Sequence, residues 1–303
     1  GDTKAPQAPA ATQPTAQAPG RPAPGQPVFD SDGDVVNALL VAVKGQDHEQ
    51  VHRLLGPAWK ELTSGDKVED AGDFKDFAAR AAEHMRIEKE DDSTSLLRVG
   101  HDDWLFPIPI VKSDGKWFFD TEAGKAEVLA RRIGQDELEA IAICRLYVKA
   151  QHEYACEDRD GSGVLKYAQR NISTPGKRDG LYWDAAGAQR QSPLGRLIAE
   201  EKLQGYEPAP GKHMPYRGYT FRVLKRQGAN APGGKIDYVI NGNMTGGFAL
   251  IAYPVAYASS GIMTFIVNQE GRVYQKDLGA DTARIARHIK EYDPDGSWTL
   301  VKD

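Results

Sequence analysis

The chain has 303 residues, of which 40% are hydrophobic and 27% charged, and its formal net charge is −5. This composition is typical of globular protein and lacks the basic field that a nucleic-acid-binding surface needs. No apolar run approaches the roughly 20 residues that cross a bilayer, so we expect no transmembrane segment. The length predicts two domains.

Residues 1–29 are rich in Pro, Ala, Gln and Thr and contain almost no large apolar side chain. Such a segment cannot bury enough surface to offset its ordering entropy, which predicts a disordered tether. The chain begins with Gly1 and not with Met, as expected where a signal peptide or a tag has been removed. We therefore expect a periplasmic or extracellular protein. The alternative is a cytosolic protein with a disordered tail.

Residues 30–134 are predicted to form an α+β domain. Apolar side chains recur at helical spacing over Asp34–Lys44, Asp47–Leu55 and about Asp73–Lys89. Strand patterns follow over Ser93–Val99, Trp104–Val111 and Lys116–Phe119. Helices followed by a curved sheet resemble the cone-shaped fold of the cystatin and ketosteroid isomerase type, which often encloses a pocket.

A long helical stretch begins at Thr121, and Gly134 predicts a break in it. The second of the two helices is expected to run from Asp136 to about Glu157. Cys144 and Cys156 would then lie about 18 Å apart along the helix axis, too far for a disulfide. We expect two buried free thiols.

Residues 135–303 are predicted to form a second α+β domain, in which this helix packs under an antiparallel sheet. After a loop-rich passage with a short helix at Pro193, strands and a last helix are expected at Tyr219–Leu224, Ile236–Ile240, within Gly246–Gly279 and at Asp281–Glu291. The Gly246–Gly279 segment carries no nucleophile, ligand cluster or phosphate loop. That absence favours recognition or assembly over catalysis.

Several stretches resemble a bacterial family catalogued as domain of unknown function 2950. They are GHDDWLFPIPIVKSDGKWFFDTEAGK, YAQRNISTPGKRDGLYW, GGFALIAYPVAYASSGIMTFIVNQEGRVYQKDLG and the helix at Asp281. The resemblance covers nearly the whole chain after the tether. It implies exported Gram-negative proteins with no assigned activity, so it supplies no catalytic residues.

The second domain is also similar to the globular heads of type IV pilins and pseudopilins. A helix is followed by a variable loop region and then by a sheet ending in TFIVNQEGRVY, in which Asn268, Gly271, Val273 and Tyr274 match the turn and last strand. Pilins begin with a strongly apolar helix, whereas this helix lies in mid-chain and carries charges such as Arg145. The resemblance implies a pilin-like head that does not build a filament.

One loop resembles the first half of a calcium-binding loop. Asp158, Asp160 and Ser162 supply oxygens at alternate positions, and a glycine follows at the sixth. Lys166 stands at the ninth position, however, and Gln169 replaces the glutamate that closes the shell. Calcium is the only cofactor that the sequence suggests, and a plain polar turn is the alternative.

His152 and Cys156 lie one helical turn apart, but no further zinc ligands accompany them, which favours a structural histidine. The best candidate recognition surface is a loop with a cationic pair beside aromatic side chains: Lys177, Arg178, Asp179, Tyr182 and Trp183. Such a group can bind a sugar, a carboxylate or an acidic partner. The alternative is a loop whose aromatic side chains anchor it in the core while its charges face water.

These observations favour a non-enzymatic binding or assembly module of the bacterial envelope, with a protein or glycan partner. The rival hypothesis is an enzyme or small-ligand-binding protein with a pocket in the first domain or in the loop Ile172–Trp183. A third, compatible hypothesis is a scaffold stabilised by calcium.

Overall fold

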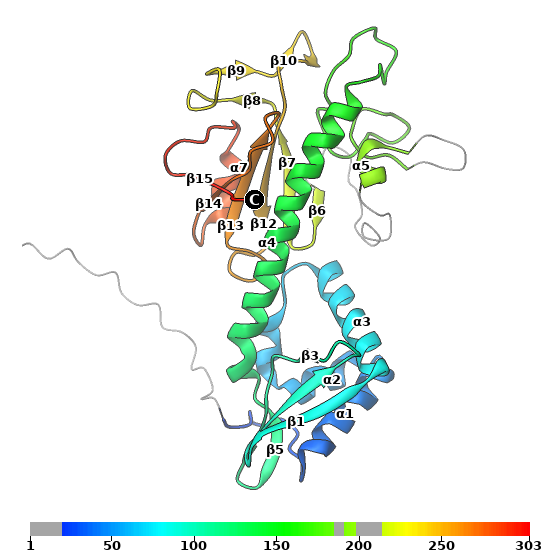
Figure 1. Cartoon of the computed structure of the whole chain (residues 1–303), viewed down its shortest axis with the longest axis vertical. Helices are drawn as coiled ribbons and strands as arrows, with labels where there is room; N and C mark the ends of the chain where they lie inside the picture. The colour runs from blue at the N-terminus through cyan, green and yellow to red at the C-terminus, as the bar shows by residue number, and fades with distance from the viewer. Residues whose placement is uncertain (1–19, 185–190, 198–213) are drawn as a thin grey trace, which may run out of the picture. The chain divides into compact units, whose positions relative to one another are not determined.

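The computed structural model describes residues 20–184, 191–197 and 214–303 and shows a mixed α+β protein (Figure 1). Its contacts divide into two compact units, Gly1–Leu62 with Phe77–Val128 and Thr63–Asp76 with Leu129–Asp303. Helices α3 (Lys67–Glu83) and α4 (Thr121–Tyr154) belong in part to each unit. Residues 1–19 of the predicted tether lie outside the described residues.

The first unit contains three short helices near its start. These are α1 (Asp32–Lys44), α2 (His48–Leu55) and the 3-10 helix η1 (Pro57–Leu62). The Ser31 hydroxyl accepts the N–H of Asp34 at the start of α1, and Asp47 accepts the N–H of Gln50 at the start of α2. Helix α2 ends at Gly56, whose φ of 75° favours glycine. The two helices predicted in this region are confirmed.

A five-stranded antiparallel sheet follows in the order β1-β2-β4-β5, with β3 paired to β2. Its strands are β1 (Met85–Asp91), β2 (Thr94–Val99), β3 (Trp104–Leu105), β4 (Ile110–Ser113) and β5 (Lys116–Phe119). The prediction that a helix continues to Lys89 was wrong, because α3 ends at Glu83 and Ile87 pairs with Leu97 across β1 and β2. Apolar residues that alternate with charged ones suit a strand here, since a partner strand is available.

Residues 20–29, predicted as the end of the tether, are bonded to the first unit. The Gly20 N–H donates to the carboxylate of Asp120 at 2.7 Å. The side-chain amide of Gln26 donates to the carbonyl of Phe119 at 2.9 Å. Hydrogen bonds therefore attach residues 20–29 to the first unit, although this segment has few apolar side chains that could pack.

Helix α4 is continuous, so the predicted break at Gly134 was wrong. A glycine in a helix interior costs only about 1 kcal/mol relative to alanine, which the packing of a buried helix face outweighs. Cys144 and Cys156 are both free, and Cys144 is buried. Cys156 lies beyond the end of α4 and is exposed, so the expectation of a second buried thiol was wrong. None of the helices in the described ranges has the length and apolar character to cross a membrane.

The second unit is built on a six-stranded antiparallel sheet in the order β15-β14-β13-β12-β7-β6. Its strands are β6 (Met214–Tyr216), β7 (Tyr219–Leu224), β12 (Ala249–Pro254), β13 (Met263–Asn268), β14 (Tyr274–Asp277) and β15 (Thr299–Leu300). Every residue of β12 is buried, which identifies this strand as the centre of the core. The strands predicted at Tyr219–Leu224 and within Gly246–Gly279 are thereby confirmed.

Small elements and two helices complete this unit. They are α5 (Pro193–Leu197), β8 (Arg226–Gln227), β9 (Ile236–Asp237), β10 (Val239–Ile240), β11 (Asn243–Met244) and α7 (Thr282–His288). On the sheet, Tyr147 of α4 donates its hydroxyl to the carbonyl of Ala249 in β12 at 2.9 Å. Arg222 of β7 donates to the carbonyls of Ala286 and Ile289 at 2.7 Å each, which places a cation at the C-terminus of α7.

Candidate functional site

The candidate site is a loop that folds back on itself after α4. Ile172 and Tyr182 form a parallel bridge at its base, where the Ser173 N–H donates to the Tyr182 carbonyl at 2.9 Å. The Ser173 hydroxyl accepts the Gly180 N–H at 2.9 Å. A side chain at position 180 would meet the backbone of Ser173 at 2.6 Å, so the close approach of the two loop arms requires glycine.

The tip of the loop is ordered by a tight turn and a carboxylate. Pro175 and Gly176, with a φ of 77° at the glycine, form the centre of the turn that the Lys177 N–H closes onto the Thr174 carbonyl. Asp179 accepts both the N–H and the hydroxyl of Thr174 at 2.7 Å. Partial burial alone raises the pKa of Asp179, but these two hydrogen bonds leave the pKa below its ordinary value.

Trp183 and Arg178 form the other wall. Trp183 is 8% exposed, and the guanidinium carbon of Arg178 lies 5.3 Å from the centre of its ring. Arg159 lies 5.9 Å from the same ring, and its guanidinium donates to the carbonyl of Tyr154 at the end of α4. The Tyr154 hydroxyl donates to the backbone carbonyl of Arg178 at 2.6 Å, which ties the loop to that helix.

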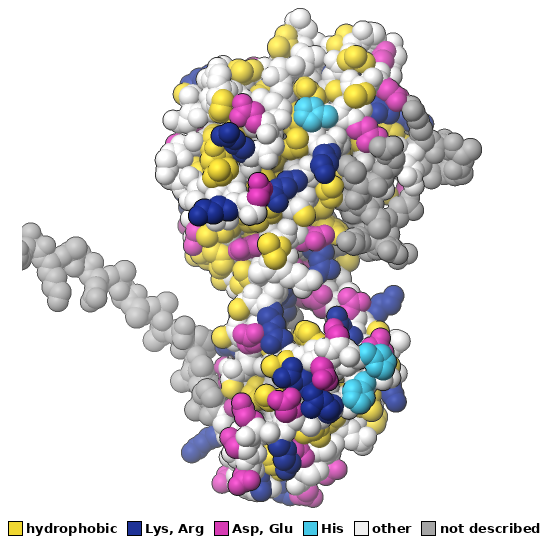
Figure 2. Space-filling view, viewed as in Figure 1, with side chains coloured by type: hydrophobic (Ala, Val, Ile, Leu, Met, Phe, Trp, Pro, Cys, Tyr) yellow, Lys and Arg dark blue, Asp and Glu magenta, His cyan; other side chains and the backbone are white. Residues whose placement is uncertain are grey.

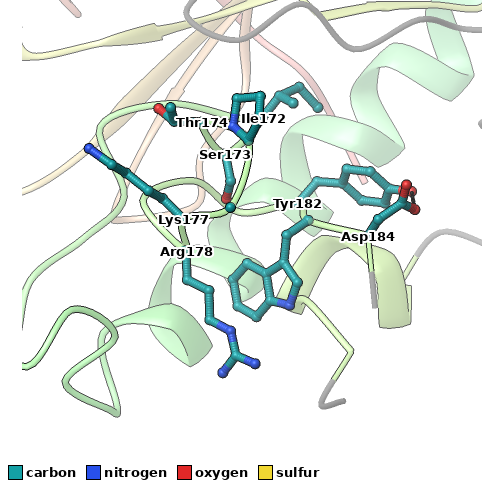
Figure 3. A pocket seen from close by; sticks show the side chains of 10 residues that line it. Ile172, Ser173, Thr174, Lys177, Arg178, Tyr182 and Asp184 are labelled. Carbon is teal, nitrogen blue, oxygen red and sulfur yellow. Dashed lines mark hydrogen bonds between the residues drawn. The ribbon is translucent and has the colours of Figure 1, made fainter. Parts of the chain in front are cut away.

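These walls enclose a cavity of about 630 Å³, lined by residues 172–178 and 182–184 (Figure 3). Its size suits a small molecule or the end of a larger ligand. In Figure 3, Tyr182 and Asp184 lie together, joined by a hydrogen bond of 3.3 Å, while Lys177 extends away from them. Four of the five residues predicted as a recognition surface line the cavity, and Asp179 instead holds the loop in shape.

The calcium-like loop holds a lysine ammonium in the described structure. The Asp158 carboxylate accepts the N–H groups of Ser162 and Gly163, as in a polar turn. The Lys166 ammonium lies 2.5 Å from an oxygen of Asp160 and 3.2 Å from the Ser162 hydroxyl. This ammonium lowers the pKa of Asp160 well below its ordinary value. Within the described ranges no group of three or more His, Cys, Asp or Glu side chains is arranged to hold a metal, and calcium binding stays a prediction.

The His152 ring packs with its centre 5.3 Å from that of Phe248, and the Cys156 thiol donates to the backbone carbonyl of His152. The contacts of His152 are therefore with aromatic side chains and a thiol, which favours a structural role for this histidine. On the face drawn in Figure 2, basic and acidic side chains alternate without a broad field of one sign.

Sequence reasoning missed one cluster of ionisable groups. Glu69 and Asp136 are 3% and 1% exposed, although acidic residues are rarely buried without partners. They are far apart in the sequence and belong to helices whose patterns show nothing unusual at either position. Only the fold reveals that they meet.

Comparison with known proteins gives one match. The family model described as "Protein of unknown function (DUF2950)" matches residues 26–301 of the chain. No curated protein and no solved structure matches. The similarity to pilin heads and to the cone-shaped fold is therefore without a structural neighbour.

Proposed function

We propose, for a chain that belongs to the DUF2950 family, a role as a non-enzymatic binding module that holds a carboxylate-bearing ligand in the loop cavity. The observation that carries the proposal is the position of the Arg178 guanidinium, which lies over Trp183 at the wall of a cavity of about 630 Å³.

The stacking prepares Arg178 for a carboxylate. When a guanidinium stacks on an indole ring, the contact uses the flat face of the guanidinium. The N–H groups at the edge of the guanidinium remain free to make a bidentate contact with a carboxylate. Neither the Arg178 guanidinium nor the Lys177 ammonium has an acidic partner among the described residues. Because no carboxylate of the described residues pairs with them, both charges are available to an anion.

The rest of the lining favours a ligand that combines the anion with a ring. Ile172 and Trp183 supply apolar surface, and the Tyr182 hydroxyl with Asp184 supplies a polar pair. An acidic sugar has this combination of a carboxylate, a ring face and hydroxyl groups. We therefore take a uronic acid, free or at the end of a glycan, as the ligand class.

The lining gives more support to binding than to catalysis. Among the described lining residues, Ser173 is the only serine, and its hydroxyl is engaged with the backbone of Gly180. Its described hydrogen bonds include no contact with a histidine, so it lacks the base that activates a serine nucleophile.

The setting that fits this function is the bacterial envelope. The chain before residue 20 would tether the module outside the cytoplasm. The second unit, with its long helix and antiparallel sheet, would serve as a pilin-like head, and the first as a cone-like domain. The partner is then a glycan, or a protein that carries the acidic group.

The test is calorimetric titration of the full chain with glucuronate, with glucose as the uncharged probe of the same ring size. Glucuronate binds and glucose does not, and Arg178→Ala weakens glucuronate binding at least about tenfold, the loss of one charged hydrogen-bonding group. Arg145→Ala, which removes an exposed cation outside the cavity, is the matched control and leaves binding unchanged. Equal binding of glucose, or no effect of Arg178→Ala, would refute the proposal.

A further inference from the structure

Two acidic side chains of the second unit are buried together beneath a turn. Glu69 belongs to the first turn of α3 and Asp136 to the middle of α4, and both are almost fully buried. Neither carboxyl accepts a hydrogen bond from any N–H or O–H group of the described residues. Buried carboxylates without donors are costly, so this arrangement needs a physical reason.

Both carboxyls face Gly218 in the turn between β6 and β7. A Cβ placed on Gly218 would lie 2.6 Å from an oxygen of Asp136 and 2.8 Å from an oxygen of Glu69. The two oxygens therefore point at the same small space. Gly218 has a φ of 74° and Arg217 a φ of 43°, as in the two-residue turns that suit a twisted hairpin.

The backbone of the turn is held from several sides. The Gly218 N–H donates to Asp66 at 3.0 Å. The Gly218 carbonyl accepts the Ser260 hydroxyl at 2.7 Å and the Val255 N–H at 2.8 Å. Since the N–H and the carbonyl of Gly218 both have partners, the turn cannot move away from the two carboxyls without breaking these bonds.

The surrounding charges do not neutralise two carboxylates. The guanidinium of Arg217, in the turn, lies 3.9 Å from the carboxylate of Asp73. Asp73 therefore competes with the buried pair for the positive charge of Arg217. At the start of α3, Asp70 and the preceding Asp66 accept backbone N–H groups.

From α4, Arg132 contributes a second positive charge, which acts on Asp73 and reaches the Ser259 carbonyl at 3.5 Å. Counting the buried pair, five carboxyl groups thus face two guanidinium groups in this part of the fold.

We propose that Glu69 and Asp136 share one proton at neutral pH and so form a proton-dependent latch beneath the Arg217–Gly218 turn. The shared proton lets one carboxyl donate to the other, which gives both a partner. At alkaline pH the proton leaves to hydroxide, two carboxylates then face each other, and the turn above them loosens.

The electrostatics support this reading. Burial raises the pKa of Asp136 strongly, and the neighbouring Glu69 raises it further, through the proton that the two carboxyls would share and through its charge. The pKa of Asp73 is also raised, mainly by burial of its carboxyl and to a smaller extent by the negative charge of Glu69. The Asp73 side chain is 46% exposed, so water screens this effect.

The sign of the stability effect follows from the raised pKa. Above the pKa of about 3.9 that an unfolded aspartate has, the folded protein binds more protons than the unfolded chain. Stability is therefore full at acidic pH and declines as pH rises toward the folded pKa. In that window the unfolding constant increases up to about tenfold per pH unit.

The test compares the full-length protein with Asp136→Asn by urea unfolding from pH 5 to pH 9. Asparagine can donate permanently to the Glu69 carboxylate, so the variant loses the pH-linked rise of the unfolding constant and is the more stable protein at pH 9. Asp76→Asn removes the same charge from an exposed position of α3 and is the matched control, with the wild-type pH profile.

Infrared spectroscopy tests the proton directly. The carbonyl band of a protonated carboxyl is expected in the wild type at pH 7 and is expected to be absent from Asp136→Asn. If Asp136→Asn folds poorly, Glu69→Gln replaces it, and the protonated carboxyl band is expected to be absent from that variant as well. A pH profile of either variant parallel to that of the wild type, or no protonated band in the wild type, overturns the proposal.

Discussion

Gln151 and Ala168 are joined by two hydrogen bonds of 2.8 Å, in which the side-chain amide of Gln151 donates to the Ala168 carbonyl and accepts the Ala168 N–H. Both residues are essentially inaccessible to water. A side chain thus performs the pairing that a neighbouring strand performs in a sheet, and it fixes the chain that leads from α4 to the candidate site.

The first prediction is that Gln151→Leu destabilises the protein by about 2 to 4 kcal/mol, because it leaves a buried N–H and a buried carbonyl without partners. Urea unfolding monitored by circular dichroism measures the change. Gln151→Glu buries a carboxyl that can donate to the Ala168 carbonyl only when it is protonated, so this variant should be more stable at acidic pH than at neutral pH. A loss below about 1 kcal/mol for the leucine variant would show that water replaces the side chain.

A second prediction concerns Lys166 and the loop Asp158–Ser162. If the ammonium occupies the position that a cation would take, Lys166→Ala frees the oxygens of Asp160 and Ser162. The variant then gains a calcium-dependent rise in melting temperature that the wild type lacks. Asp160→Ala in the same background should remove it. A rise already present in the wild type would show that calcium displaces the lysine.

The third prediction distinguishes the two thiols. Cys156 is exposed, whereas burial raises the pKa of the Cys144 thiol to about 12. The native protein should therefore react with one equivalent of a thiol reagent at pH 8, and with two after denaturation. Cys156→Ser should abolish the native reaction. Reaction of two thiols in the native state would mean that α4 opens readily at Cys144.

The sequence predicted those parts of the fold in which the pattern of one segment suffices. Tyr219–Leu224 alternates, α1 has one apolar face, and the turn signals of the loop Ile172–Trp183 led to the cavity. Ile87 could not be assigned from its own segment, because its strand depends on pairing with Leu97. Gly134 was misread for a similar reason, since packing of α4 overrides a local preference.

The two functional arrangements were predictable to different degrees. Lys177 and Arg178 beside Trp183 are neighbours in the sequence, so their chemistry was visible there. Glu69 and Asp136 lie close together because two helices pack beneath a turn that is distant in the sequence. No pattern in either helical segment predicts this contact. The role of Asp179 could not be predicted from the sequence either. Its hydrogen bond to Thr174, which the structure shows, indicates that it orders the loop and does not line the cavity.

The burial of β12 has a further consequence for how the protein reaches its fold. The segment Ala249–Pro254 is uncharged and apolar, and Met263–Asn268 beside it is similar. Uncharged segments rich in β-forming residues pair with copies of themselves when they are exposed. Pairing of β12 with β7 and β13 within one chain therefore competes with pairing between chains. Newly made chains depend on rapid formation of this sheet, or on a chaperone, to avoid aggregation.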